Sequence, residues 1–203
     1  MNAGKRALDV VVSSFGLIVS SPVLALAALA IKLEDRGPIL YKQQRVGKDG
    51  VDFELLKLRT MVVGAEKMGA GLAVNRGDSR ITRTGRLLRR LSLDELPQLW
   101  NILRGDMSIV GPRPTLRHQV DKYTPRQLRR LEVRPGLTGW AQVNGRAELP
   151  WAERIELDVW YVEHRSPTTD LLILLRTPRA LFRGTYKGTR GGWRHGGSKN
   201  SSD

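Results

Sequence analysis

The stretch that decides the fold is VVVSSFGLIVSSPVLALAALAI, which spans residues 10–31. It holds no charged side chain, and as a helix rising ~1.5 Å per residue it would reach about 33 Å, roughly the thickness of a bilayer core. A cleaved signal peptide is one alternative, but the run is long for one, and no small-residue cleavage site precedes Lys32. The run therefore predicts a membrane helix.

A hinge lies near the middle of this run, at Ser20, Ser21 and Pro22. Proline has no N–H and clashes with the preceding turn, so it kinks or breaks a helix. The serine hydroxyls can bond the backbone groups that the proline releases, which matters where water is absent. We expect a helix–break–helix at Ser21 and Pro22, with an ordinary kinked spanning helix as the alternative.

The flanks of the run are basic on both sides, with Lys5 and Arg6 before it and Lys32 and Arg36 after it. Positive flanks favour the cytoplasmic side of a membrane. A straight span cannot keep both flanks there, whereas a helix that dips in and returns can. This pattern predicts a re-entrant, monotopic segment over residues 1–36 on the cytoplasmic face of the membrane.

Composition narrows the class of protein. The chain has 203 residues, 40% of them apolar, and a formal net charge of +14 from 34 basic and 20 acidic side chains. This length and apolar content predict one compact unit with a real core. The absence of cysteine excludes disulfides, a thiolate zinc site and a cysteine nucleophile. The surplus charge calls for an anionic partner: nucleic acid, membrane head groups or phosphorylated small molecules.

The rest of the chain predicts an α+β fold that is mainly α. A small β-hairpin is expected from residues 39–46 and 51–61, which flank a Gly-Lys-Asp-Gly turn. The last expected helix sets a leucine run beside arginines, which suits a helix in a membrane interface or, equally, a core helix with a solvated basic face. We expect residues 37–183 to form a cytoplasm-facing catalytic domain with interfacial helices and 184–203 a flexible basic tail. The expected helices cover residues 61–68, 82–91, 92–103, 116–131 (broken near Pro125, with Arg126, Arg129 and Arg130 exposed), 151–164 and 170–182.

The adjacent acids Asp94 and Glu95 are the first candidates for chemistry. Ser92 and Glu95 fit a capping box, in which both acids would only stabilise a helix start. Against that interpretation, Pro97 constrains the segment further, and clusters of arginine lie on both sides. Ionised carboxylates in such surroundings can hold Mg²⁺ together with substrate phosphate, and an ionised aspartate can attack phosphorus.

Several further side chains are candidates for binding an anion. Arg113 lies between two prolines, which leave it little conformational freedom for gripping phosphate, and Arg134 precedes Pro135. Each arginine equally fits a surface charge or a structural ion pair. Gln142 and Asn144 offer hydrogen bonds to a base or sugar, or to local backbone. Asp158 lies four residues after Arg154, so a helix ion pair is the simpler interpretation of that acid.

The chain resembles the bacterial sugar transferases, the monotopic polyprenyl-phosphate phosphoglycosyl transferases, in their minimal catalytic-core form. The resemblance runs from Lys5 to about Phe182, and its specificity comes from the order of the segments. Pro150-Trp151-Ala152 departs from the more usual Ser-Trp-Glu, and no family counterpart is evident for the tail beyond Gly184. The segments are KRALDVVVSS (5–14), SSPVLALAALAIKLEDRGPILYKQQRVG (20–47), FELLKLRTM (53–61), RITRTGRLLRRLSLDELPQLWNILRGDMSIVGPRP (80–114), RPGLTGWAQVNGR (134–146) and LDVWYVEHRS (157–166).

This resemblance implies a re-entrant helix broken at Ser21 and Pro22, with Asp94 as nucleophile and with Mg²⁺ held by Asp94 and Glu95. Among the binding residues it carries over, the roles of Arg45, Lys57 and Arg59 are less defined than the others. The residues expected to bind substrate or phosphate are Arg45, Lys57, Arg59, Arg86, Arg113, Arg134, Gln142, Asn144, Arg146 and Asp158.

The function implied is transfer of a phospho-sugar from a UDP-sugar donor to polyprenyl (undecaprenyl) phosphate, with release of UMP through an aspartyl intermediate. It would be the first membrane step of bacterial glycan assembly, at the cytoplasmic face of the inner membrane. Anionic lipid is an expected partner, a homodimer is possible and nucleic acid is not expected. The alternatives are a membrane-tethered nucleic-acid-binding protein, for which aromatic residues are sparse at 6%, and an envelope scaffold.

Overall fold

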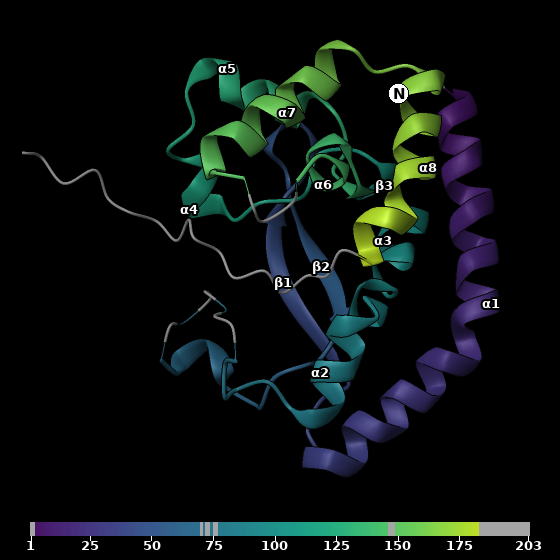
Figure 1. Cartoon of the computed structure of the whole chain (residues 1–203), viewed down its shortest axis with the longest axis vertical. Helices are drawn as coiled ribbons and strands as arrows, with labels where there is room; N and C mark the ends of the chain where they lie inside the picture. Colours follow the sequence, from purple (N-terminus) through teal and green to yellow (C-terminus); the bar gives the residue numbers. More distant parts are fainter. Residues whose placement is uncertain (1–2, 70, 72–73, 75–76, 146–148, 183–203) are drawn as a thin grey trace, which may run out of the picture.

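The N-terminal helix α1 (Ala3–Asp35) runs without interruption through Pro22. Its axis changes direction partway along its length in the computed structural model (Figure 1). Pro22 has no N–H to offer the carbonyl of Ile18, and the Ser21 hydroxyl donates to that oxygen instead, at 2.8 Å. Ser20 likewise donates to the Gly16 carbonyl at 2.6 Å. The structure therefore differs from the expected helix–break–helix: the segment bends while the helix continues.

One side of α1 is open and the other is packed. The helix is long and apolar enough to cross a membrane, and only 11% of its most apolar window is buried. On the packed side, Leu17 joins a core cluster built on Phe53 and Leu99, and Ile31 joins a second cluster with Leu58. The open side carries the largely exposed side chains of Val11, Phe15, Ile18, Leu26 and Leu33.

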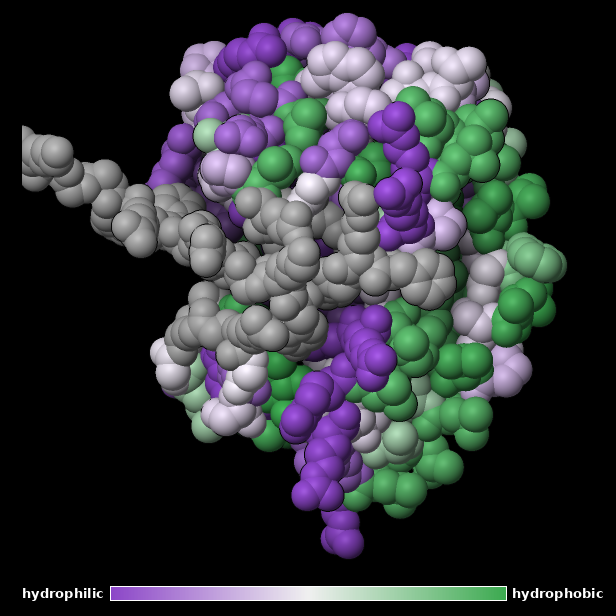
Figure 2. Space-filling view, in the orientation of Figure 1, coloured by the Kyte–Doolittle hydropathy of each residue, from purple (hydrophilic) through white to green (hydrophobic). Residues whose placement is uncertain are grey.

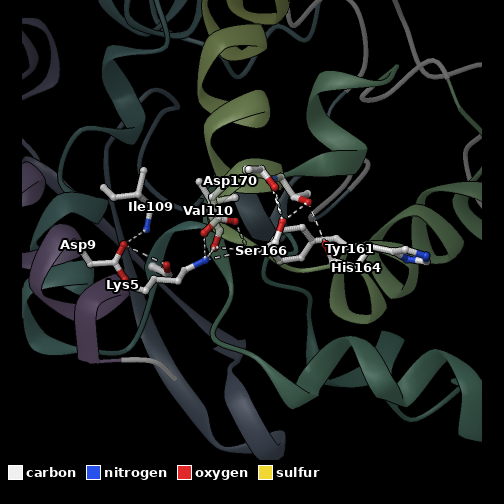
Figure 3. Close-up of polar contacts among 11 residues, drawn as sticks. Lys5, Asp9, Ile109, Val110, Tyr161, His164, Ser166 and Asp170 are labelled. Atoms are coloured by element: carbon white, nitrogen blue, oxygen red, sulfur yellow. Dashed lines mark hydrogen bonds and ion pairs between the residues drawn. The ribbon is translucent and has the colours of Figure 1, made fainter.

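The beginning of α1 is fixed to the rest of the chain by two charged side chains (Figure 3). Asp9 is only 2% exposed, and its Oδ1 accepts the backbone N–H of Ile109 at 2.9 Å and the Ser108 hydroxyl at 3.1 Å. The ammonium of Lys5 donates to Asp170 at 2.7 Å, to the Tyr161 hydroxyl at 2.8 Å and to the Val110 carbonyl at 3.1 Å. A half-buried cation with three acceptors is well compensated for its lost hydration.

The end of α1 is fixed as well. Asp35 forms an ion pair with Arg59. The Glu34 carboxylate accepts the backbone N–H groups of Arg83 and Thr84 at 2.7 and 3.0 Å, so it caps the start of α2 (Arg83–Arg90). An anion at a helix N-terminus satisfies unpaired N–H groups and the helix dipole. Both ends of α1 are thus bound to one body.

The structure describes residues 3–69, 71, 74, 77–145 and 149–182. The predicted hairpin is confirmed: β1 (Leu40–Val46) and β2 (Asp52–Leu58) pair antiparallel from Leu40↔Leu58 to Val46↔Asp52. A second small sheet pairs β3 (Ser108–Val110) with β4 (Gly136–Thr138) in parallel. The remaining elements are η1 (Lys48–Gly50), η2 (Ala65–Lys67), η3 (Leu93–Glu95), α3 (Gln98–Arg104), α4 (Arg117–Val120), α5 (Pro125–Leu128), η4 (Arg129–Glu132), α6 (Trp140–Val143), α7 (Trp151–Glu163) and α8 (Pro167–Phe182).

The mainly helical character of the fold is confirmed, but two expected helices are wrong in extent. Residues 92–103 form η3 and then α3, because Ser92 has a left-handed backbone (φ 56°) and Pro97 supplies no N–H. Residues 61–68 contain only the single turn η2. The break expected near Pro125 is confirmed, because α4 ends at Val120 and α5 begins at Pro125, with η4 following it. The flexible tail expected over 184–203 lies outside the described residues.

We predict that Asp9→Ala lowers the free energy of unfolding by about 1–3 kcal/mol, the cost of leaving buried donors without an acceptor. The measurement is thermal unfolding in detergent, where about 2–4 °C corresponds to 1 kcal/mol for a chain of this size. Asp52→Ala is the matched control, because the exposed Asp52–Arg117 ion pair contributes at most about 1 kcal/mol. Equal, small losses in the two variants would contradict an anchoring role for Asp9.

Candidate active site

A cleft of about 1250 Å³ lies between the β1–β2 hairpin, η3, the Gly111–Pro114 loop and helices α6, α7 and α8. It brings together acids, arginines and amides from segments far apart in the chain. The predicted site residues that line it are Arg45, Lys57, Arg59, Asp94, Glu95, Arg113, Gln142 and Asp158.

Asp94 and Glu95 reach the cleft because η3 is held at both of its ends. Leu93 packs against the core cluster that contains Ile31, and Leu96 packs against the one that contains Leu99. The capping-box interpretation of these acids is wrong: Ser92 makes no side-chain cap. Glu95 binds Lys57 Nζ at 2.9 Å and Arg113 at 2.5 Å instead.

Asp94, unlike Glu95, has a carboxylate that no described side chain binds. It is 9% exposed, and no described residue donates a hydrogen bond to its carboxylate. Burial raises the pKa of Asp94 above its usual value, the charge of Glu95 adds to the rise, and the nearby Lys57, Arg89 and Arg113 partly oppose it. The carboxylate is left open toward the cleft with cations around it.

Glu95 stays ionised. Its burial acts to raise its pKa, but the adjacent charges of Arg113 and Lys57, together with their hydrogen bonds, outweigh burial and hold the pKa of Glu95 well below its usual range. Glu95 in turn raises the pKa of Arg113. The dyad of Asp94 and Glu95 therefore contains two carboxylates in different states. Glu95 is bound in ion pairs, whereas Asp94 is open to the cleft, and the difference comes from their surroundings.

The loop that carries Arg113 is held by contacts between backbones. The N–H of Gly111 donates to the Thr138 carbonyl at 2.9 Å, and the N–H of Gly136 donates to the Pro112 carbonyl at 2.8 Å. A Cβ added at Gly136 would lie 2.1 Å from the Gly111 nitrogen, and one at Gly139 would lie 2.1 Å from the Gly111 oxygen. These glycines are needed because two main chains meet there.

Three further polar side chains of the cleft, Gln142, Asp158 and Arg45, differ in how they are bonded. Both amide atoms of Gln142 are buried and unbonded within the described part of the chain, so they are available to a ligand. Asp158 bonds the buried Arg130 and not Arg154, so the expected helix ion pair is absent. Burial, and then the charge of Arg113, lower the pKa of Arg45 to about 10.

Not every predicted binding residue lies in the cleft. Arg86 is exposed on α2 and is not among the described residues that line the cleft. Arg134 lies beside Gly105 at the end of α3, also off the cleft. Asn144 does not line the cleft: its side chain donates to the Trp140 carbonyl and accepts from Arg176. Arg59 reaches the wall but is engaged by Asp35. Arg146 lies outside the described residues.

Sequence reasoning missed other cleft residues. Arg130, expected to be exposed, is 4% exposed. Arg89 lines the cleft from α2 and donates to the Thr60 hydroxyl at 2.7 Å. Arg89 lies only three residues after Arg86, close to the same face of α2, so helix periodicity alone does not single it out as the cleft residue. The remaining missed arginines are Arg154, Arg176 and Arg179.

The carboxylates of Asp94 and Glu95 are the candidate ligands for a divalent cation. Within the described residues no group of three or more acidic or histidine side chains is placed to hold a metal ion. Asp94 and Glu95 nevertheless fit Mg²⁺, which is commonly held by one or two carboxylates together with substrate phosphates. The open carboxylate of Asp94 supplies an oxygen that no described side chain occupies.

Comparison with known proteins shows the family. The bacterial sugar transferase family matches residues 1–184, so this chain belongs to the bacterial sugar transferases. It is 45% identical to the uncharacterized sugar transferase EpsL of Bacillus subtilis, over 88% of this chain and 87% of that protein. It is 48% identical to the UDP-glucose:undecaprenyl-phosphate glucose-1-phosphate transferase of Caulobacter vibrioides, over 88% of this chain and 69% of that one.

A longer relative shares the same core. The UDP-N-acetylgalactosamine-undecaprenyl-phosphate N-acetylgalactosaminephosphotransferase of Aeromonas hydrophila is 41% identical over 89% of this chain, which corresponds to 44% of that protein. The predicted family and the prediction of a transferase enzyme are confirmed.

We predict that Asp94→Asn stabilises the protein at pH 7. Because the folded state raises the pKa of Asp94, its ionisation costs stability once the pH is above that raised pKa, and the cost vanishes as the pH falls below the unfolded value. A gain of about 1 kcal/mol would raise Tm by about 2–4 °C. Thermal unfolding across pH measures this effect.

The matched variant Glu95→Gln is expected to have the opposite sign. The folded state lowers the pKa of Glu95, so its stabilising contribution is present at neutral pH and is lost as the pH falls. Destabilisation by Asp94→Asn at pH 7 would show that Asp94 is a structural group.

Proposed function

We propose that this enzyme transfers a phospho-sugar from a UDP-sugar to polyprenyl phosphate, with Asp94 as the nucleophile. The observation that carries the proposal is a buried carboxylate without a hydrogen bond from the described residues, open to a cleft rich in arginine. Two of the relatives, those of Caulobacter vibrioides and Aeromonas hydrophila, carry both undecaprenyl phosphate and a UDP-sugar in their names.

In the first half-reaction, an Asp94 oxygen attacks the β-phosphorus of the donor. The bond from that phosphorus to the oxygen bridging the two phosphates breaks, and UMP leaves with the electron pair. Lys57, Arg89 and Arg113 are the cations that act on the Asp94 carboxylate and would offset the charge on the phosphoryl oxygens. Glu95 holds Lys57 and Arg113 in place for that role.

In the second half-reaction, a phosphate oxygen of the lipid acceptor attacks the same phosphorus. The bond to Asp94 breaks, the carboxylate is restored, and the product is a polyprenyl diphosphate-sugar. The Gln142 amide atoms, which bond no described residue, and the buried Arg130–Asp158 pair line the cleft, where they would contact the nucleotide or sugar. Bound Mg²⁺, held by Asp94 and Glu95 with diphosphate oxygens, would neutralise charge on the leaving phosphate.

We also propose that α1 enters the membrane and returns to the same face. Its two ends bind one body through Lys5 and Asp9 at the start and through Glu34 and Asp35 at the end. A helix held at both ends by one body does not thread straight through a bilayer. On this proposal residues 1–36 form the membrane segment, and residues 37–183 form the catalytic domain at the cytoplasmic face of the inner membrane.

The nucleophile is tested by trapping. We predict that incubation with a UDP-sugar alone gives a mass increase of one phospho-sugar and a stoichiometric burst of UMP. Asp94→Asn should show neither, because an amide cannot form the acyl phosphate bond. Intact-protein mass spectrometry and UMP release read the outcome over a panel of donors.

Glu95→Gln is the companion variant, expected to slow the burst by about 10²–10³-fold, the usual effect of disturbing one group that stabilises charge. Chelation by EDTA should suppress the burst, and added Mg²⁺ should restore it. An adduct on Asp94→Asn, or its normal turnover, would refute the assigned nucleophile.

The membrane arrangement gives a separate prediction. Impermeant reagents applied to intact cells should label neither of two cysteines introduced near the two ends of α1, at exposed Gly4 and Arg36. Both should react after the membrane is permeabilised, because both would lie in the cytoplasm. Labelling of only one of the two in intact cells would show a straight span.

A further inference from the structure

Helix α8 carries two arginines that line the cleft. Arg176 and Arg179 line the same cleft as Asp94. The Arg176 guanidinium lies over the Trp140 ring, 5.4 Å from its centroid, and donates to Asn144 at 3.4 Å. Neither arginine forms an ion pair with a residue that the structure describes. Their charges are therefore available to an anion, unlike that of Arg113, which Glu95 holds, or that of Arg130, which Asp158 holds.

The same helix presents leucines to the outside. Leu172 and Leu175 precede the arginines by four residues each, so each leucine–arginine pair shares a helix face. Leu175 is 70% exposed, whereas Ile173 on the packed side is fully buried. An exposed apolar stripe that ends in guanidinium groups without an ion pair to the described residues is complementary to an anionic head with a hydrocarbon chain.

This stripe continues the open side of α1. Helix α8 runs beside the first part of α1, and the surface on that side of the molecule is largely hydrophobic (Figures 1 and 2). The Lys5–Asp170 ion pair and the Tyr161 hydroxyl fix the start of α8 to α1 (Figure 3). Helix α8 thus contributes both to the lining of the cleft, through Arg176 and Arg179, and to the apolar surface, through Leu172 and Leu175.

The geometry points to Arg176 and Arg179 as the subsite for the phosphate of the lipid acceptor, with its first isoprene units along Leu172 and Leu175. The inference rests on the proposed function and divides the cleft: the donor diphosphate lies with Arg113 and Lys57, and the acceptor phosphate enters from α8. Arginine suits this role because its planar fork binds phosphate oxygens in pairs.

The test separates the two half-reactions in the full-length protein in detergent micelles. Arg176→Gln/Arg179→Gln is expected to keep the UMP burst with donor alone within about 2-fold. Its KM for undecaprenyl phosphate should rise about 10- to 100-fold, as the loss of charge-assisted hydrogen bonds predicts. The charge-matched control is Arg83→Gln/Arg90→Gln, whose arginines are exposed on α2 away from the cleft lining, and its KM should not change.

An unchanged acceptor KM in the double variant overturns the inference. If that variant loses the burst, Arg179→Gln alone carries the test, because the Arg179 side chain makes no hydrogen bond with a described residue. A raised KM with an intact burst in this single variant supports the subsite, and an unchanged KM refutes it. If wild-type protein gives no burst with any donor, the proposed function itself fails.

Membrane lipid is the competing source of phosphate. The same KM measurement is made in micelles without phospholipid and in micelles containing phosphatidylglycerol. A defect in both conditions supports acceptor binding. A defect that appears only with phosphatidylglycerol would assign the arginines to membrane headgroups and would refute the inference.

Discussion

The attachment of α1 at both of its ends is the constraint on which the rest of the structure depends. At its start, Asp9 bonds the strand β3 that leads directly into the Arg113 loop, and at its end Asp35 bonds Arg59, just after β2. The apolar helix is therefore part of the scaffold of the cleft and not a tether joined to it. The helix that is long and apolar enough to cross a membrane thus also holds the segments that form the walls of the cleft.

The chemistry of the cleft follows from a difference between adjacent acids. Glu95 neutralises Lys57 and Arg113 and fixes their positions, while Asp94 remains without a hydrogen bond from the described residues. Burying a carboxylate in this way costs stability that a structural residue would not need to lose. Such a cost is typical of groups kept for reaction.

Part of the fold and of the candidate site was predictable from the sequence, because local sequence patterns determine those parts. The 10–31 run predicted α1, the Gly-Lys-Asp-Gly turn predicted the hairpin, and the two prolines around Arg113 indicated a fixed guanidinium. The predictions that were wrong concern residues whose positions depend on tertiary contacts. Ser92 followed by Asp94 and Glu95 has the sequence of a capping box, but packing of Leu93 and Leu96 turns both acids into the cleft. Arg130 has the sequence context of a surface arginine, yet Asp158, far along the chain, buries it.

The close approach of Gly111 to Gly136 and Gly139 has a consequence for how this enzyme could change during evolution. Main-chain atoms, not side chains, set the spacing there, so even one added methyl group would push the Arg113 loop away from the dyad. Divergence in sugar preference is therefore confined to the other walls of the cleft. There, side chains such as Gln142 define the space, and exchanging one of them leaves the phosphate-handling apparatus in register.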